Sequence, residues 1–274
     1  MRNQIYVFTL MIFVIFIMSC STESNSHTDW EFEYPLTIGN NWQYNSIYEI
    51  DYDENCEALG YQDKSITGEA TVQISSFETI LDSLNVFNFE TTYIEEDILN
   101  HSKEYYNKSN NSFICYAYDN SENFTPKNNN KKIKFKFNDK LYDNIQQIFT
   151  ILQKGYDVYD KNSIIYDPSI SLQYPFEINN KWISRQSNNP WKVEKEIIGK
   201  KRISLPAGEF DCWEIQWTFP ESDWNNDIDF RDYVSKEGLI KRIINYNNIE
   251  VTNNNNILIG YSNDKHEIIL LDYN

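Results

Sequence analysis

The chain has 274 residues, a formal net charge of -17 and an aromatic content of 16%. So much negative charge repels nucleic-acid phosphates, and we therefore expect no nucleic-acid partner. The length suits one large β domain or two small ones, and the aromatic residues favour strands.

The first twenty residues predict an export signal. Arg2 precedes an apolar run over residues 5–18, which is shorter than the roughly 20 residues of a membrane-spanning helix. Residues 17–20, Ile-Met-Ser-Cys, resemble the lipobox of bacterial lipoproteins. The resemblance implies cleavage before Cys20 and attachment of a diacylglycerol, with palmitate among its chains, to the cysteine sulfur. A plain cleaved signal and an uncleaved anchor are the alternatives.

Residues 21–33 are predicted to be a flexible tether, because their first part is rich in Ser, Thr and Asn and has no apolar cluster. Ser21 stands where an aspartate usually marks retention at the inner membrane. The lipoprotein resemblance therefore implies a membrane-anchored protein of the cell envelope, sorted to the outer membrane.

Two stretches of the body share the pattern Y-P-x-x-I-x-N-x-W, at residues 34–42 and 174–182. A second match joins residues 86–93 to 212–219, and a looser third match joins 112–114 to 238–240. Because the three landmarks keep their order, they predict an internal repeat; chance similarity is the alternative.

The period-two patterns of both halves predict a mainly β fold of antiparallel, curved, half-barrel-like sheets. We expect a first half at 34–126, a connecting strand and helix at 127–160, and a second half at 161–274. The strands expected in the first half are residues 67–74, 84–93, 103–106 and 113–118.

The connecting segment changes its period. Residues 132–137 alternate Lys with apolar residues and predict an edge strand protected by its lysines, with phosphate binding as the alternative. An amphipathic helix is then expected over residues 139–154, capped by Asn138 or Asp139 and ended by Gly155. The apolar residues at helical spacing are Leu141, Ile145, Ile148, Phe149 and Leu152.

The second half contains two predicted hairpins. Pro206 and Gly208 suit a three-residue loop with a bulge, and Gly238 suits the turn between strands at 228–234 and 239–246. The strand that leaves the first hairpin places four apolar residues on one face: Trp213, Ile215, Trp217 and Phe219.

These turns carry a family resemblance. The phrases P-A-G-x-F-x-C at residues 206–212 and Y-x-S-x-x-G-L-I-K at 233–241, with the lipobox and the 34–42 stretch, resemble a group of uncharacterised bacterial lipoproteins. The resemblance spans most of the mature chain. It implies an architecture similar to the half-barrel of lipoprotein-carrier proteins and brings no catalytic residues. The first half departs from it, since it lacks the Pro-Ala-Gly turn.

Patterns of catalysis are missing. The histidines are His27, His101 and His266, and there is no G-x-S-x-G or H-E-x-x-H motif, so we expect neither an enzyme nor a cofactor. A glycosidase that uses paired carboxylates stays open, because carboxylates are abundant and none is singled out.

Two acidic loops have the alternating oxygen ligands of a calcium loop, one at residues 51–57 and one at 223–229. Both lack the glycine that an EF-hand needs, since Cys56 and Ile228 stand there, so solvated loops are the better interpretation and no metal is expected. The weak calcium candidates are Asp223, Asn225, Asp227 and Asp229.

With Cys20 assigned to lipid, Cys56, Cys115 and Cys212 remain. One disulfide with one free thiol, and three buried thiols, are both compatible with the sequence.

The remaining functional signal is aromatic. Four tryptophans either form core or line a ligand groove: Trp42, Trp182, Trp213 and Trp217. The first hypothesis is a non-enzymatic envelope lipoprotein, bound to the membrane through Cys20, whose sheets hold a lipid or other apolar ligand. The second is a structural or interaction module that meets an envelope protein or a glycan. An apolar groove of roughly 300 Å³ beside the tryptophans would separate them.

Overall fold

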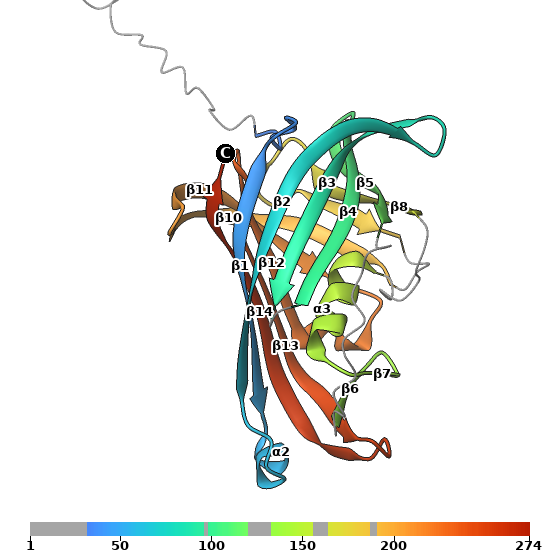
Figure 1. The fold of residues 1–274 in the computed structure, drawn as a ribbon, viewed down its shortest axis with the longest axis vertical. Coiled ribbons are helices and arrows are strands. Elements are labelled where there is room, and N and C mark those ends of the chain that lie inside the picture. Colours follow the sequence, from blue (N-terminus) through green and yellow to red (C-terminus); the bar gives the residue numbers. More distant parts are fainter. Residues whose placement is uncertain (1–31, 96–97, 120–132, 156–163, 187–190) are drawn as a thin grey trace, which may run out of the picture. The chain divides into compact units, whose positions relative to one another are not determined.

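The computed structural model describes residues 32–95, 98–119, 133–155, 164–186 and 191–274 (Figure 1). The predicted signal, Cys20 and most of the predicted tether lie outside these ranges. Phe32–Asn274 forms one compact unit. Phe32 opens this unit, and its buried ring packs 4.7 Å from that of Phe176.

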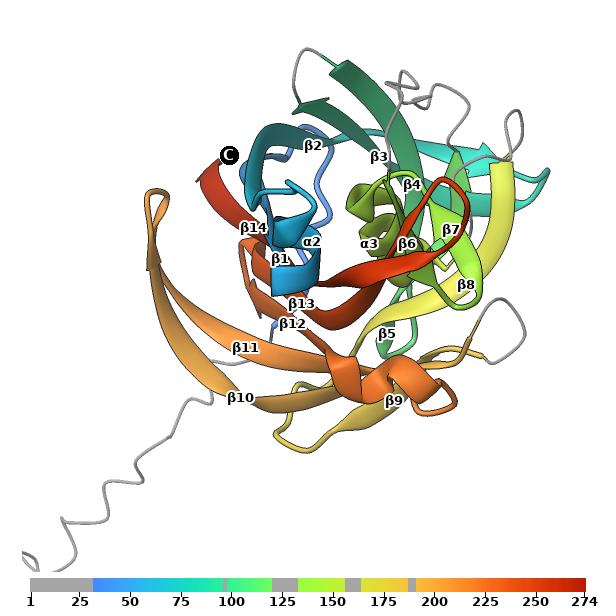
Figure 2. The ribbon, with the colours of Figure 1, turned by 90° about the horizontal axis from the view of Figure 1, so that it is seen from below.

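The described residues are mainly β, as predicted, and form one antiparallel sheet (Figures 1 and 2). The predicted first half contributes β1 (Asn41–Tyr52), β2 (Lys64–Ile80), β3 (Leu84–Glu95), β4 (Ile98–Ser109) and β5 (Ser112–Asp119). The predicted second half contributes β8 (Ile164–Gln173), β9 (Lys181–Arg185), β10 (Val193–Leu205), β11 (Gly208–Thr218), β12 (Ile228–Ser235), β13 (Gly238–Asn253) and β14 (Leu258–Tyr273). β6 (Ile133–Phe137) pairs with β13 and with β7 (Lys140–Tyr142).

The strand order is β8-β5-β4-β3-β2-β1-β14-β13-β12-β11-β10-β9. β1 to β5 therefore form an antiparallel meander of five strands, with β8 paired to β5 at its end, and β9 to β14 form a second meander of six strands. The two meanders join where β1 pairs with β14, so the halves share one strongly curved, nearly closed sheet.

The sheet closes at a seam between its two end strands, β8 and β9. Side chains bridge this seam: the Trp182 indole and the Ser184 hydroxyl donate to the Ile170 carbonyl at 3.1 and 2.8 Å. The Lys195 ammonium, on β10, donates to the Ser171 carbonyl at 3.1 Å. The seam is thus held by side chains that reach the backbone of β8.

The internal repeat is visible in the turns before β1 and β9. The Asn40 and Asn180 amides donate to the carbonyls of Pro35 and Pro175, each at 3.1 Å. Residues 39 and 179 both have positive φ, +98° for Gly39 and +70° for Asn179. The two Y-P-x-x-I-x-N-x-W motifs therefore build the same turn, and each delivers a buried tryptophan to the first strand of its meander.

The predicted helix exists but is shorter. α3 spans Ile145–Lys154, where Asn144 caps its first turn and Gly155, with φ +80°, ends it as expected. Its start was predicted too early, because the chain first turns back on itself and forms β7 against β6. Figure 2 shows α3 on the concave side of the sheet, and its apolar stripe is buried there.

The acidic stretch at 51–57, predicted to be a loop, instead contains most of a short helix, α2 (Glu54–Ala58). The Asp53 carboxylate caps this helix by accepting from the Cys56 amide at 2.9 Å. Neither α2 nor α3 is long and apolar enough to cross a bilayer, and the described residues contain no other helix that is.

Both predicted hairpins of the second half form. Leu205 pairs with Gly208, so the loop holds two residues rather than the three expected. Gly208 has φ +134°, and Gly238, opposite Ser235, has φ +113°. The glycines were thus placed correctly, while the loop length was not, because the strand pairing continues to the residues that flank the turn.

Gly208→Val is expected to lower the free energy of unfolding by about 1–3 kcal/mol, because a β-branched residue resists positive φ. A Cβ at this position would lie 3.8 Å from its nearest neighbour, the Phe210 ring, so the cost is conformational rather than steric. Pro206→Ala should cost less, about 0.4–1 kcal/mol. Urea melts of both variants test the order; two equal, small effects would contradict it.

Candidate functional site

The four candidate tryptophans all lie in the core. Their exposed fractions are between 2% and 6%: Trp42, Trp182, Trp213 and Trp217. The Trp42 indole donates to the Glu237 carbonyl at 2.6 Å, and its ring lies parallel to that of Phe89. In the described part of the chain these rings thus contact the protein's own residues, which favours the core interpretation of the aromatic pattern.

Trp217 belongs to a buried ionic cluster. Its ring stacks on Phe230 at 4.0 Å, and its indole donates to Asp232 Oδ2 at 2.9 Å. Arg242 forms two hydrogen bonds with the same carboxylate, from Nε at 2.6 Å and from Nη2 at 3.0 Å. Arg242 Nη1 also donates to Gln153 Oε1, at 2.7 Å, so the cluster ties α3 to the sheet.

A second ion pair lies under the same helix. Lys154 Nζ is 3.2 Å from Glu104 Oε1, and the Tyr106 hydroxyl donates to Glu104 Oε2 at 2.8 Å. Burial acts against ionisation of Glu104, but Lys154 and the tyrosine hydroxyl outweigh it and hold the pKa of the carboxyl below its usual value.

Two further cations are buried beside the seam. Lys195 is 4% exposed, and its ammonium lies 3.6 Å from the centre of the Trp217 ring. Burial is the main cause that lowers the pKa of Lys195, to about 7. Arg185, at the end of β9, is 5% exposed and donates through Nη2 to the Gln153 carbonyl at 3.2 Å. Neither residue was singled out in the sequence.

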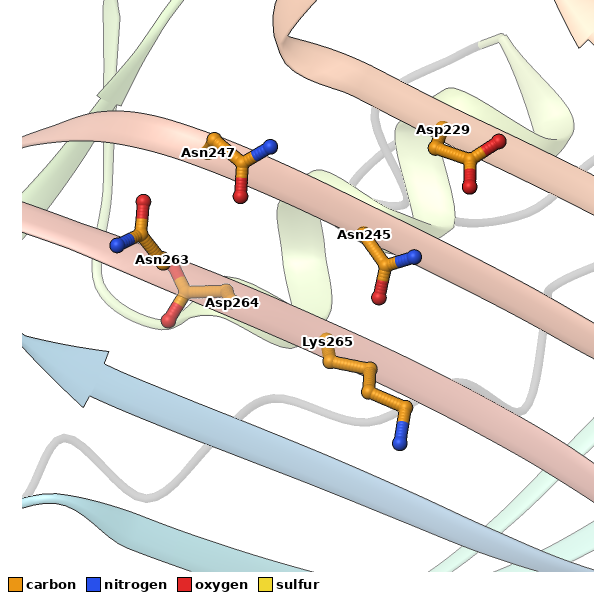
Figure 3. Close-up of a pocket in the computed structure, with 6 residues that line it drawn as sticks. All are labelled: Asp229, Asn245, Asn247, Asn263, Asp264 and Lys265. Carbon is orange, nitrogen blue, oxygen red and sulfur yellow. The ribbon is translucent and has the colours of Figure 1, made fainter.

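A polar pocket of about 370 Å³ opens on β12, β13 and β14 (Figure 3). Every residue that lines it is polar or charged: Asp229, Asn245, Asn247, Asn263, Asp264 and Lys265. Asn245 pairs with Asp229 on one neighbouring strand and with Lys265 on the other, so three of these residues form a row across the sheet. Such a pocket suits a partner that offers hydroxyl, amide or charged groups.

Asp264 is the buried member of the pocket, 2% exposed. Its Oδ2 accepts from the Ser262 hydroxyl at 2.8 Å, and burial raises the pKa of the carboxyl to about 7.

Nearby on β14, His266 stacks on Tyr48 at 4.0 Å and contacts the Ser46 hydroxyl through Nε2 at 3.0 Å. Burial lowers the pKa of His266 to about 3, so its ring is neutral at physiological pH. His101 contacts the Thr92 hydroxyl, and His27 lies outside the described residues.

The weak calcium candidates contact their own chain. Asp223–Asp227 forms a 3₁₀ turn, in which Asn225 Oδ1 accepts from the Phe219 amide. Asp227 Oδ1 accepts from the Asn248 amide group at 3.2 Å, and Asp229 accepts from Arg231 Nε at 2.8 Å. Over the described ranges, no group of three or more His, Cys, Asp or Glu side chains is arranged to hold a metal ion.

The cysteine alternatives are resolved in favour of three buried thiols. Cys56, Cys115 and Cys212 are free and at most 1% exposed. Burial raises the pKa of the Cys212 thiol to about 12, which makes it a poor nucleophile.

Comparisons with known proteins give distant likenesses only. No family model matches the chain, and no curated protein does. One similar solved structure is a "putative exported protein with YmcC-like fold" from Bacteroides fragilis, with 13% identity and a TM-score of 0.39 over 89% of this chain and 99% of that one. A "putative lipoprotein" from Parabacteroides distasonis has 17% identity and a TM-score of 0.38 over 89% and 98%. A "beta-barrel-like protein" from Brucella abortus has 10% identity and a TM-score of 0.35 over 85% and 97%.

Proposed function

We propose that this protein is a non-enzymatic lipoprotein of the bacterial cell envelope, anchored in the outer membrane through lipid on Cys20. The lipobox-like residues 17–20 and the serine at position 21 support the anchor and its sorting. The folded body from Phe32 onward then acts as an interaction module that meets a protein or glycan of the envelope.

The observation that carries this proposal is the occupied concave side of the sheet. The tryptophans that would line an apolar groove are nearly fully buried, and the stripe of α3 packs among them and their neighbours. An acyl chain would have to displace these side chains, and removing one large core residue from its contacts typically costs about 3–5 kcal/mol. The second hypothesis, an interaction module, therefore fits the described residues better than an apolar-ligand carrier.

The pocket on β12–β14 supports a polar partner. Its amides and charges form hydrogen bonds readily, and they sit on paired strands that hold them in a fixed register. A partner recognised here would present polar groups, as glycans and protein surfaces do, whereas an acyl chain would offer this polar lining no hydrogen bonds.

The anchoring part is tested by Cys20→Ala. We expect this variant to leave the membrane fraction, because a diacyl anchor dominates partitioning and the net charge of -17 offers no attraction to anionic lipid. The control is Cys212→Ala, which changes a buried thiol and should stay with the membrane. A Cys20→Ala protein that still sediments with membranes would overturn the lipid anchor.

A further inference from the structure

We propose that the interior beside the β8–β9 seam binds an oxoanion, such as a phosphate, sulfate or carboxylate group, through Arg185 and Lys195. This proposal is independent of the interaction surface on β12–β14. It rests on the buried guanidinium of Arg185, whose Nε and Nη1 have no partner among the described residues, and on the buried Lys195 close to it.

Arg185 carries the first part of the argument. Only Nη2 has a partner, the Gln153 carbonyl at 3.2 Å, while Nε and Nη1 are buried and have no partner among the described residues. A guanidinium presents five N–H donors in a planar arrangement, so a single acceptor leaves most of them unused. A buried charge with unused donors is costly unless a ligand or counter-ion satisfies it.

The interior carboxylates are already engaged. Asp232 pairs with Arg242, and Glu104 pairs with Lys154. Within the described ranges, neither Arg185 nor Lys195 has a carboxylate within ion-pair distance. Asp167, on β8, is close enough for the charge of Arg185 to act on its carboxyl group. Burial raises the pKa of Asp167, which weakens it as a counter-ion.

A capping role for Arg185 explains only part of its geometry. Its guanidinium lies against Gly155 so closely that a Cβ there would overlap it, and it donates to a carbonyl in the last turn of α3. Cations at a helix C-terminus are favourable, so this contact stabilises α3. Capping uses one of the five N–H donors of the guanidinium, however. The remaining donors include Nε–H, and the planar arrangement of guanidinium N–H groups suits the oxygens of an oxoanion.

Lys195 supplies the second cation from the neighbouring strand. Its ammonium donates to the Ser171 carbonyl and lies over Trp217, with further N–H donors on the same nitrogen. Arg185 is close enough for its charge to act on Lys195. On the other side of the seam, the hydroxyl oxygens of Ser169 and Tyr118 lie 3.4 Å apart. Tyr118 is also close enough for the charge of Arg185 to act on its hydroxyl group.

On this proposal an oxoanion reaches these groups by local opening of the seam. β8 and β9 occupy the two ends of the strand order, and the bonds that join them come from the side chains of Trp182, Ser184 and Lys195. Local opening here breaks few hydrogen bonds compared with opening any paired strands of the sheet. When an oxoanion reaches Lys195, the ammonium would donate to this charged acceptor instead of to the Ser171 carbonyl.

The test titrates sulfate against the full lipidated chain in phosphatidylcholine nanodiscs, with chloride holding the ionic strength constant. Tryptophan emission and the melting temperature are followed, because Lys195 lies over Trp217. We expect a saturable response, and Arg185→Gln should weaken it about tenfold or more, since a charge-assisted bond is lost. The matched control is Arg202→Gln on β10, an exposed arginine that pairs with Glu209 and should leave sulfate binding unchanged.

The pH dependence of sulfate affinity tests whether Lys195 contacts the ion. A lysine with only a structural role would not change this dependence. Lys195 is charged below about pH 7, so sulfate affinity should rise as the pH falls through that value, and Lys195→Met should abolish the rise. The charged and titratable groups that act on Lys195 are Asp232, Arg242, Arg185 and Cys115. Of these, the buried Cys115 has a raised thiol pKa and stays neutral in this range.

A further arm separates a free ion from a lipid headgroup. If a lipid-borne phosphate is the natural ligand, nanodiscs that contain phosphatidylglycerol should raise the melting temperature without sulfate. If the ligand is a free ion, only added sulfate should raise the melting temperature. If Arg185→Gln does not fold, the wild-type titration and Lys195→Met decide. An absent or non-saturable wild-type response, or equal binding by Arg185→Gln, would overturn the proposal.

Discussion

Trp217→Ala is expected to lower the free energy of unfolding by about 3–5 kcal/mol, the typical cost of removing a buried aromatic side chain. The ring stacks on Phe230, carries the Lys195 ammonium on its face and donates to Asp232. Its loss would leave a cavity, remove one of the hydrogen bonds to the buried Asp232 carboxylate and leave a cation without its aromatic contact. Since a typical domain is stable by about 5–15 kcal/mol, the variant would be near the limit of folding.

Two controls separate the contributions to this loss. Trp217→Phe keeps much of the stack and loses the indole N–H, so it should cost less than Trp217→Ala. Tyr166→Ala removes an aromatic ring that is 56% exposed on β8, and it should change stability by less than about 0.5 kcal/mol. Urea unfolding followed by far-UV circular dichroism gives all three values. A Trp217→Ala cost close to that of Tyr166→Ala would show that the ring is not core.

Asp232→Ala is the second large effect, with an expected loss of about 3–5 kcal/mol. The Asp232 side chain is 6% exposed and holds Arg242 through two hydrogen bonds. Removal of the carboxylate leaves the Arg242 guanidinium buried without its counter-ion and the Trp217 indole without its acceptor. Most of the cost is therefore the desolvation of the partners left behind.

The matched control is Asp229→Ala, three residues earlier on the same strand. Asp229 also pairs with an arginine, Arg231, but that pair is 37–39% exposed, so its loss should cost about 0–1 kcal/mol. Combining Asp232→Leu with Arg242→Met removes both charges and should recover part of the stability. Equal losses for Asp229→Ala and Asp232→Ala would contradict the assignment of a buried ionic cluster.

Local chemistry explains what the sequence could predict. The Pro206–Gly208 turn, the Gly155 helix end and the apolar stripe of α3 depend on backbone geometry and on periodicity, and each is found near its expected place. The repeat was also visible, because the two Y-P-x-x-I-x-N-x-W turns use identical bonds. The start of α3 was missed, since β7 forms only when β6 is available as a partner.

The ionic cluster and the seam depend on contacts between distant segments. Gln153, Asp232 and Arg242 meet only after α3 enters the concave side of the sheet. One signal was nonetheless present in the sequence. Asp232 follows Phe230 at period two, and Lys195 lies between Val193 and Ile197, so each charge occupies an inward position of an alternating strand. Inward charges of this kind predict a buried partner, although they do not identify it.

The protein's own side chains occupy the concave side of the sheet. The most direct measurement adds a neutral long-chain monoacylglycerol to the body from Phe32 onward and follows tryptophan emission, so that headgroup charge plays no part. We expect blue-shifted emission before any lipid is added, no saturable change afterwards, and a large loss of stability for Trp217→Ala. A saturable spectral response to the lipid that Trp217→Ala weakens without destabilising the fold would contradict it.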